Sequence, residues 1–232
     1  MIFPLLQEVV VRASHVVYPV ICPLCEKVPP FGEQICTHCL YRLPRTQMHR
    51  EVDNAFTRRL WGRVPLQAAA AMLHYRKGNS VQQLVHEFKY KGKQDIGYKL
   101  FQRYGWQLRD QPHFADVDMI VPVPLHRRKL RARGYNQAKI LAEGLRSGLN
   151  KPLIEAVVRS EHTRSQTRKG RMQRADNVSG VFQVPRPERL ENKHLLLVDD
   201  VVTTGATLEA CAQDLLSIPG IRISMVALAI TE

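Results

Sequence analysis

The stretch LLLVDDVVTTGATL, residues 195–208, changes character twice along its length. Four apolar residues precede Asp199 and Asp200, and an unbroken apolar run is typical of a buried central strand in a parallel sheet. Two more apolar residues lead into small, hydroxyl-rich residues, and we expect a helix to begin there, near Gly205 or Ala206. The stretch therefore predicts a strand, a tight turn and a helix N-terminus in that order.

This predicted turn is typical of a phosphate-binding loop. Open α/β sheets bind ligands where parallel strands end, and the backbone N–H groups and dipole of the following helix favour an anion. We infer that the phosphate is held by Thr203, Thr204, Gly205, Ala206 and Thr207. The carboxylates of Asp199 and Asp200 accept hydrogen bonds from sugar hydroxyls, so the inferred ligand is a ribose 5-phosphate. The alternative, a solvated Asp pair followed by an ordinary threonine N-cap, explains each half of the stretch but not their conjunction.

Strands and helices alternate along the rest of the chain from Ala68 onward. Strand patterns occur at 68–75, 117–124, 155–160, 194–200 and 222–230, and helix patterns at 81–92, 96–110, 136–149 and 205–217. This alternation predicts an α/β fold with a mostly parallel, twisted sheet and helices on both faces. Neither a Walker A motif nor a GxGxxG fingerprint is present. The expected divisions are an N-terminal helix (1–20), a zinc ribbon (21–42), a connector (43–66) and a main domain (67–232).

Two CxxC pairs lie close together near the N-terminus, and they contain Cys22, Cys25, Cys36 and Cys39. Each pair lets two thiolates converge from one tight turn, and two such turns complete the tetrahedral sulfur cage that Zn²⁺ favours. Two disulfides are the alternative, but the absence of a secretory signal favours a reducing compartment and therefore zinc. Because protein fills all four positions, we expect the zinc to be structural.

The net charge of +13 is concentrated in one part of the chain. Residues 121–180 carry fourteen Lys or Arg side chains against four acidic ones, which is +10 of the total. A merely basic surface explains scattered charge better than this concentration, which favours phosphate-bearing partners, either a small molecule or a nucleic acid. The densest cluster comprises Arg127, Arg128, Lys129, Arg131 and Arg133, with Tyr135 as a candidate for stacking on a base.

The sequence predicts a protein that does not span a membrane, because no window approaches the roughly 18 uninterrupted apolar residues that a span requires. The apolar residues 1–20 are interrupted by Gln7, Glu8 and Arg12, which favours a short amphipathic helix packed on the body. A helix at a membrane interface is the alternative. No signal peptide is predicted, so we expect a cytoplasmic protein, with the inner face of the membrane as the alternative location.

Residues 195–207 resemble the 5-phosphoribosyl-1-pyrophosphate signature of type I phosphoribosyltransferases at every position. The rest of the chain is similar to the ComF family of competence proteins, including its GntX-like members. The segments that carry this similarity are the two CxxC pairs, FKYKG at 88–92, VPVPLHRRKLRARGYNQA at 121–138 and TRSQTRKGRMQRADNVSGVF at 163–182.

The resemblance implies a role for each part of the site. Asp199 and Asp200 would hold the ribose hydroxyls, with Mg²⁺ as a further cofactor. Val123, Pro124 and Leu125 would form the loop that approaches the pyrophosphate, with a cis bond possible before Pro124. Residues 160–180 would form a mobile lid, from which Arg164 and Arg171 would close over the pyrophosphate.

Several functions remain open at this point. The ComF resemblance implies a role in natural competence, in which the protein handles incoming single-stranded DNA and its ribbon docks a partner such as the competence helicase. The basic cluster fits a DNA backbone, although the same cations also suit pyrophosphate alone. The alternatives are a phosphoribosyltransferase of nucleotide salvage and a regulator that senses the sugar phosphate without chemistry. Turnover itself stays open, because the sequence shows neither an acceptor-binding segment nor a general base.

Overall fold

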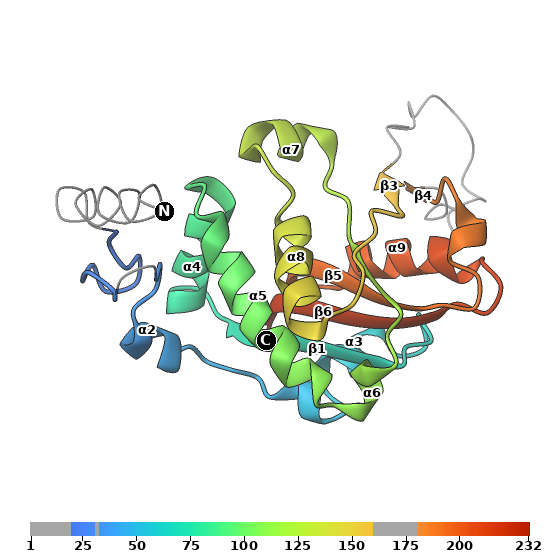
Figure 1. Cartoon of the computed structure of the whole chain (residues 1–232), viewed down its shortest axis with the longest axis horizontal. Helices are drawn as coiled ribbons and strands as arrows, with labels where there is room; N and C mark the ends of the chain where they lie inside the picture. Colours follow the sequence, from blue (N-terminus) through green and yellow to red (C-terminus); the bar gives the residue numbers. More distant parts are fainter. Residues whose placement is uncertain (1–19, 31–32, 160–180) are drawn as a thin grey trace, which may run out of the picture.

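The computed structural model of the chain describes residues 20–30, 33–159 and 181–232. Its centre is a four-stranded, all-parallel sheet with the strand order β1-β6-β5-β2 (Figure 1). The strands are β1 (Ala68–Tyr75), β2 (Met119–Pro122), β5 (His194–Val202) and β6 (Arg222–Thr231). The α/β fold expected from the alternating patterns is therefore confirmed.

Strand β5 is one of the two inner strands, as its apolar run predicts. Leu195, Leu196, Leu197 and Val198 are all fully buried. The strand does not stop at the Asp pair, however, because β6 continues to pair with it as far as Val202. Asp199 and Asp200 therefore lie within the strand, where successive side chains point to opposite faces of the sheet.

Helices cover both faces of the sheet. Helices α4 (Ser80–Tyr90), α5 (Gln94–Arg109) and α8 (Gln137–Leu149) pack together on one side (Figure 1). Helices α3 (Ala55–Leu60) and α9 (Ala206–Leu216) meet on the other side, where α9 contacts β5 and β6 and α3 contacts β1. The main helices that the sequence patterns predict, α4, α5, α8 and α9, are all present.

Helices α5 and α8 approach each other unusually closely through glycine. A methyl group added at Gly105 would lie 2.9 Å from the Cα atom of Gly148. Only a residue without a side chain fits there, so the close contact explains why both positions are glycine. The contact fixes α8, and the N-terminus of α8 borders the candidate site.

Shorter elements complete the described structure. They are α2 (Thr37–Tyr41), η1 (Met48–Arg50), α6 (Pro112–Ala115), α7 (Arg127–Arg133), η2 (Pro187–Arg189) and the antiparallel pair β3 (Val158–Arg159) and β4 (Phe182–Gln183). The strands β3 and β4 flank residues 160–180, which lie outside the described residues, as do the candidates Arg164 and Arg171. The N-terminal helix expected over 1–20 also falls almost entirely outside them. No helix in the described ranges is long and apolar enough to cross a membrane.

The segment 43–66 contains more structure than its weak patterning predicts. Helix α3 begins with a capping box, in which Asn54 accepts hydrogen bonds from the N–H groups of Phe56 and Thr57. Phe56 and Leu60 are fully buried. A six-residue helix offers only these two buried apolar positions, which is too few for a recognisable period.

Candidate ligand-binding site

A cavity of about 230 Å³ lies at the carboxyl ends of β2 and β5. Its lining combines acidic, hydroxyl-bearing and basic side chains from separate elements of the chain. Of the residues singled out in the sequence, it includes Asp199, Asp200, Thr203, Thr207, Val123, Pro124, Leu125, Lys129 and Arg133. The cavity therefore brings together the carboxylate pair, part of the predicted phosphate loop and part of the basic cluster.

The two carboxylates have different environments. Asp200 forms ion pairs with Lys89 of α4, at 2.8 Å, and with Arg133 of α7, at 3.8 Å. Asp199 lies towards α9 and accepts a hydrogen bond from the N–H of Asp200 at 2.8 Å. Burial, followed by the nearby charge of Asp200, raises the pKa of Asp199 to about 7. Lys89 and Lys129 offset this effect only in part, so the pair suits a further positive group such as Mg²⁺, which prefers carboxylate oxygens.

Residues 203–207, which we call the threonine loop, surround a second hollow of about 40 Å³ beside the first. Asp199 lines both hollows, so it lies on the same side of the molecule as Thr204. Gly205 is the N-cap of α9 and has φ of +82°, a left-handed conformation that favours glycine. The helix N-terminus thus begins where the sequence places it, with its N–H groups beside the hollow.

The loop after β2 is held against β5 and α8. The N–H of Val123 donates to the Val198 carbonyl at 2.9 Å, and the Asn136 side chain donates to the Val123 carbonyl at 3.0 Å. The Val123–Pro124 peptide is trans. Val123, Pro124 and Leu125 of this loop line the cavity together with Thr203 and Thr207.

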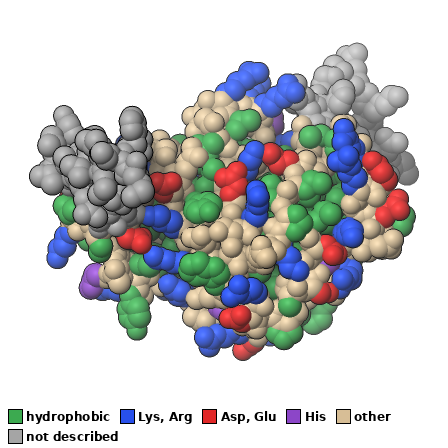
Figure 2. Space-filling model, in the orientation of Figure 1, with side chains coloured by type: hydrophobic (Ala, Val, Ile, Leu, Met, Phe, Trp, Pro, Cys, Tyr) green, Lys and Arg blue, Asp and Glu red, His purple; other side chains and the backbone are tan. Residues whose placement is uncertain are grey.

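The basic cluster forms helix α7, and the helix divides its cations into two sets. Lys129 and Arg133, four residues apart and so on one face, line the cavity. Arg128 and Arg131 are exposed to solvent. Figure 2 shows Lys and Arg side chains gathered over α7.

Two cationic residues of the cavity received no role in the sequence analysis. Lys89 lies within the quoted FKYKG segment but received no role, and Arg159 comes from β3. Both reach the cavity through tertiary packing, so no local pattern around Asp199 indicates them. The recurrence of FKYKG in the resembling family is the only signal that points to Lys89.

Tyr135 does not occupy the exposed position that a base-stacking residue needs. Its ring is half-buried and packs edge-on against Phe88, with 6.0 Å between ring centroids. Its hydroxyl group is buried and has no hydrogen-bond partner among the described residues. The neighbouring exposed aromatic is Tyr90, which is 59% exposed and lies 5.4 Å below the Arg133 guanidinium.

The four paired cysteines converge as predicted. Their sulfur atoms all lie within 4.8 Å of one another, and none of these cysteines forms a disulfide. A tetrahedral zinc site with Zn–S bonds of about 2.3 Å requires sulfur separations of about 3.8 Å, so the cluster fits the ion. The backbone N–H of Cys39 lowers the pKa of Cys36 to about 7, whereas burial raises the pKa of Cys39.

The residues around the four cysteines, 20–30 and 33–42, are called the cysteine module here, and they pack on the main domain through α4 and α5. Cys22 is fully buried, and the side chain of Gln83 on α4 donates a hydrogen bond to the Pro23 carbonyl. Glu33 forms an ion pair with Arg103 of α5 at 3.1 Å. The module is therefore attached on the side of the sheet that carries α4, α5 and α8.

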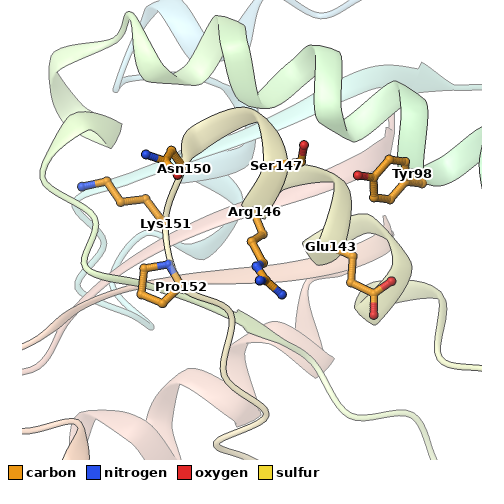
Figure 3. A pocket seen from close by; sticks show the side chains of 7 residues that line it. All are labelled: Tyr98, Glu143, Arg146, Ser147, Asn150, Lys151 and Pro152. Atoms are coloured by element: carbon orange, nitrogen blue, oxygen red, sulfur yellow. The ribbon is translucent and has the colours of Figure 1, made fainter.

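A larger hollow of about 800 Å³ lies at the C-terminal end of α8, away from the carboxylate pair. It is lined by Tyr98, Glu143, Arg146, Ser147, Asn150, Lys151 and Pro152. Figure 3 shows that the charged side chains diverge, with Lys151 and Arg146 pointing in different directions. A ligand site requires polar groups that converge on one point, so size alone does not make this hollow the functional one.

Residues 106–229, just over half of the chain, match the phosphoribosyl transferase domain family. The chain belongs to this family. The matched phosphoribosyl transferase domain begins within α5 and contains β2, α7, α8, β5, α9 and most of β6. It therefore includes the carboxylate pair and the threonine loop, but neither Lys89 nor the cysteine module.

Among relatives, the chain is 28% identical to "DNA utilization protein YhgH" of Escherichia coli K12, over 84% of each chain. It is 27% identical to "Competence protein ComFC" of Bacillus subtilis, over 84% of this chain and 71% of that one. It is 31% identical to "Competence protein F" of Haemophilus influenzae, over 58% of this chain and 60% of that one. The resemblance to the ComF group is thus confirmed.

Proposed function

We propose that this protein binds 5-phosphoribosyl-1-pyrophosphate together with Mg²⁺ at the ends of β2 and β5, and handles single-stranded DNA in natural transformation. One observation carries the first part: a single cavity contains Asp199 and Asp200, Thr203 and Thr207 of the threonine loop, and four cations. Its cations are Lys89, Lys129, Arg133 and Arg159. A ribose that carries a phosphate at one position and a pyrophosphate at another matches a lining that combines carboxylates, threonines and cations.

Each group of side chains has a separate task in this proposal. The threonine loop donates backbone N–H and hydroxyl groups to the 5-phosphate. Asp199 and Asp200 accept hydrogen bonds from the ribose hydroxyls, and with the ligand's own oxygens they would hold Mg²⁺, which neutralises pyrophosphate charge. Lys129 and Arg133 stabilise the pyrophosphate beside the Val123–Leu125 loop.

The proposed DNA role is supported by the names of the relatives and by the charge on α7. The related proteins are named for competence and DNA utilization. The exposed Arg128 and Arg131 lie outside the cavity lining and so remain available to a phosphate backbone. Docking of a helicase by the cysteine module remains part of the same proposal.

Calorimetric titration tests the ligand assignment. We expect one molecule of 5-phosphoribosyl-1-pyrophosphate to bind per chain in the presence of Mg²⁺, and ribose 5-phosphate and inorganic pyrophosphate each to bind more weakly. The ligand would then engage both halves of the cavity at once. If inorganic pyrophosphate bound as tightly as the complete ligand, the site would recognise no sugar and the assignment would be wrong.

The double variant Arg128→Gln/Arg131→Gln is expected to weaken binding of single-stranded DNA and to flatten its salt dependence. Each lost phosphate contact lowers the slope of log affinity against log salt by about 0.7, so two contacts remove about 1.4. Filter binding from low to high salt measures the slope. The matched control is Arg146→Gln/Lys151→Gln at the larger hollow, which removes the same charge elsewhere. Equal losses in both variants would contradict a DNA site on α7.

A further inference from the structure

Helix α3 lies outside the segment that matches the family, yet it contacts the threonine loop. The Arg59 guanidinium donates hydrogen bonds to the carbonyl of Thr203 and, at 2.6 Å, to the carbonyl of Thr231 at the end of β6. Arg63, three residues beyond the end of α3, forms an ion pair with Glu209 of α9 at 2.6 Å and reaches the Thr204 carbonyl at 3.5 Å. Arg59 in α3 and Arg63 just beyond it therefore contact successive carbonyls of the loop.

These contacts orient the N–H groups of the loop. In a trans peptide the C=O of one residue and the N–H of the next point in opposite directions. Holding the Thr203 and Thr204 carbonyls towards α3 therefore directs the N–H groups of Thr204 and Gly205 away from α3. A phosphate is bound by N–H groups of such a turn, so their direction decides how well the loop binds it.

The backbone of the loop also rests directly on α3. A methyl group added at Gly205 would lie 2.9 Å from Cδ2 of Leu60, which is itself fully buried. The positive φ favours glycine at this position, and the absence of a side chain lets Leu60 pack closely against it. Leu60 thus packs against the loop at Gly205, while the two arginines contact the carbonyls of Thr203 and Thr204.

Helix α3 is itself anchored to the central sheet. The side-chain amide of Asn54, its N-cap, donates to the Ala69 carbonyl in β1 at 2.8 Å. Phe56 and Leu60 are buried in the core. The helix therefore connects the threonine loop rigidly to β1.

We propose that Arg59 and Arg63 are positioning residues for the 5-phosphate of the ligand, acting through the carbonyls of the threonine loop. This inference rests on the proposed function for the ligand, but the support of the loop by α3 is testable without any ligand. It assigns a binding role to a part of the chain outside residues 106–229. Recognition of pyrophosphate, by contrast, does not depend on α3, because Lys129 and Arg133 belong to α7.

The test compares Arg59→Gln and Arg63→Gln in the full chain. It measures the affinity for ribose 5-phosphate, the affinity for inorganic pyrophosphate, and amide hydrogen exchange without ligand. We expect affinity for ribose 5-phosphate to fall about tenfold in Arg59→Gln and less in the more exposed Arg63→Gln, because charge-assisted hydrogen bonds to the loop are lost. Affinity for inorganic pyrophosphate should stay within about twofold. Amide hydrogen exchange at 203–207 should accelerate without ligand.

The matched control is Arg58→Gln on the same helix. Arg58 pairs with Asp53 at 2.7 Å, and both side chains are mostly exposed, so this variant removes the same charge without touching the loop. It should change neither affinity nor exchange at 203–207. Unchanged amide exchange in Arg59→Gln, or an equal loss of affinity for ribose 5-phosphate and for inorganic pyrophosphate, would overturn the inference. If the unaltered protein bound no sugar phosphate, the proposed function would fail, while exchange would still decide whether α3 holds the loop.

Discussion

Replacing Asp199 or Asp200 by asparagine is expected to weaken binding of 5-phosphoribosyl-1-pyrophosphate at least tenfold, and the double variant at least a hundredfold. Each substitution removes a charged acceptor for ribose hydroxyls and for Mg²⁺, and charge-assisted hydrogen bonds contribute about 1.5–3 kcal/mol each. Calorimetry with Mg²⁺ present measures the loss. An unchanged affinity in the double variant would show that the sugar lies elsewhere.

The same two substitutions should shift stability in opposite directions. Asp199 is half-buried beside Asp200, and its pKa is raised from 3.8 to about 7. Asp199→Asn should therefore raise the free energy of unfolding at pH 8, by on the order of 1–2 kcal/mol. Asp200→Asn should lower it by a similar amount, because Lys89, 2.8 Å away and only 15% exposed, loses its partner.

The pH dependence of Asp199→Asn provides the internal control. Between pH 4 and pH 7 the folded protein keeps a proton on Asp199 that the unfolded chain has released, so this group makes the wild-type protein less stable as pH rises. The advantage of the asparagine variant should be complete above pH 7 and vanish below pH 4. Chemical denaturation of the variant and the wild type measures the difference in the free energy of unfolding at pH 4 and at pH 8. A constant advantage would contradict a raised pKa at Asp199.

The opposite stability effects expected for the two substitutions follow from the repulsion between the two carboxylates and from the ion pair that only Asp200 forms. Two adjacent carboxylates repel each other in the ligand-free protein, and the cation and polyhydroxylated ligand of the proposed function would relieve that repulsion on binding. Lys89 forms an ion pair with Asp200, whereas Lys89 and Lys129 compensate Asp199 only in part. If both predictions hold, Asp199 lowers folding stability and raises ligand affinity.

The local features of this site were predictable from the sequence, and its long-range features were not. An apolar run followed by Asp199, Asp200 and a threonine-rich turn specifies strand, loop and helix through neighbouring residues alone. Lys89 and Arg159 reach the same cavity from α4 and β3 through packing, which no single window records. The half-buried position of Tyr135 was not predictable either, because it depends on packing against Phe88, a residue distant in sequence.

Removal of zinc is expected to unfold the cysteine module while the parallel sheet survives. Zinc contributes roughly 10 kcal/mol or more to the folding of small metal-dependent modules, which are usually unfolded without it. We expect chelation, or the double variant Cys22→Ser/Cys36→Ser, to accelerate proteolysis and amide exchange within residues 20–42. Affinity for 5-phosphoribosyl-1-pyrophosphate should change little, because no cysteine of the module lines the cavity.

The fifth cysteine supplies the control for this prediction. Cys211→Ala alters a fully buried side chain in α9 and should lower overall stability, yet leave metal content at one zinc per chain. Elemental analysis should find no zinc in the double variant. Because Cys22 is buried against the main domain, loss of the ion should also expose the surface of α4 and α5 beneath the module, and exchange should rise there as well. A chelated sample with an unchanged exchange pattern over residues 20–42 would mean that the four sulfurs need no metal to hold their arrangement.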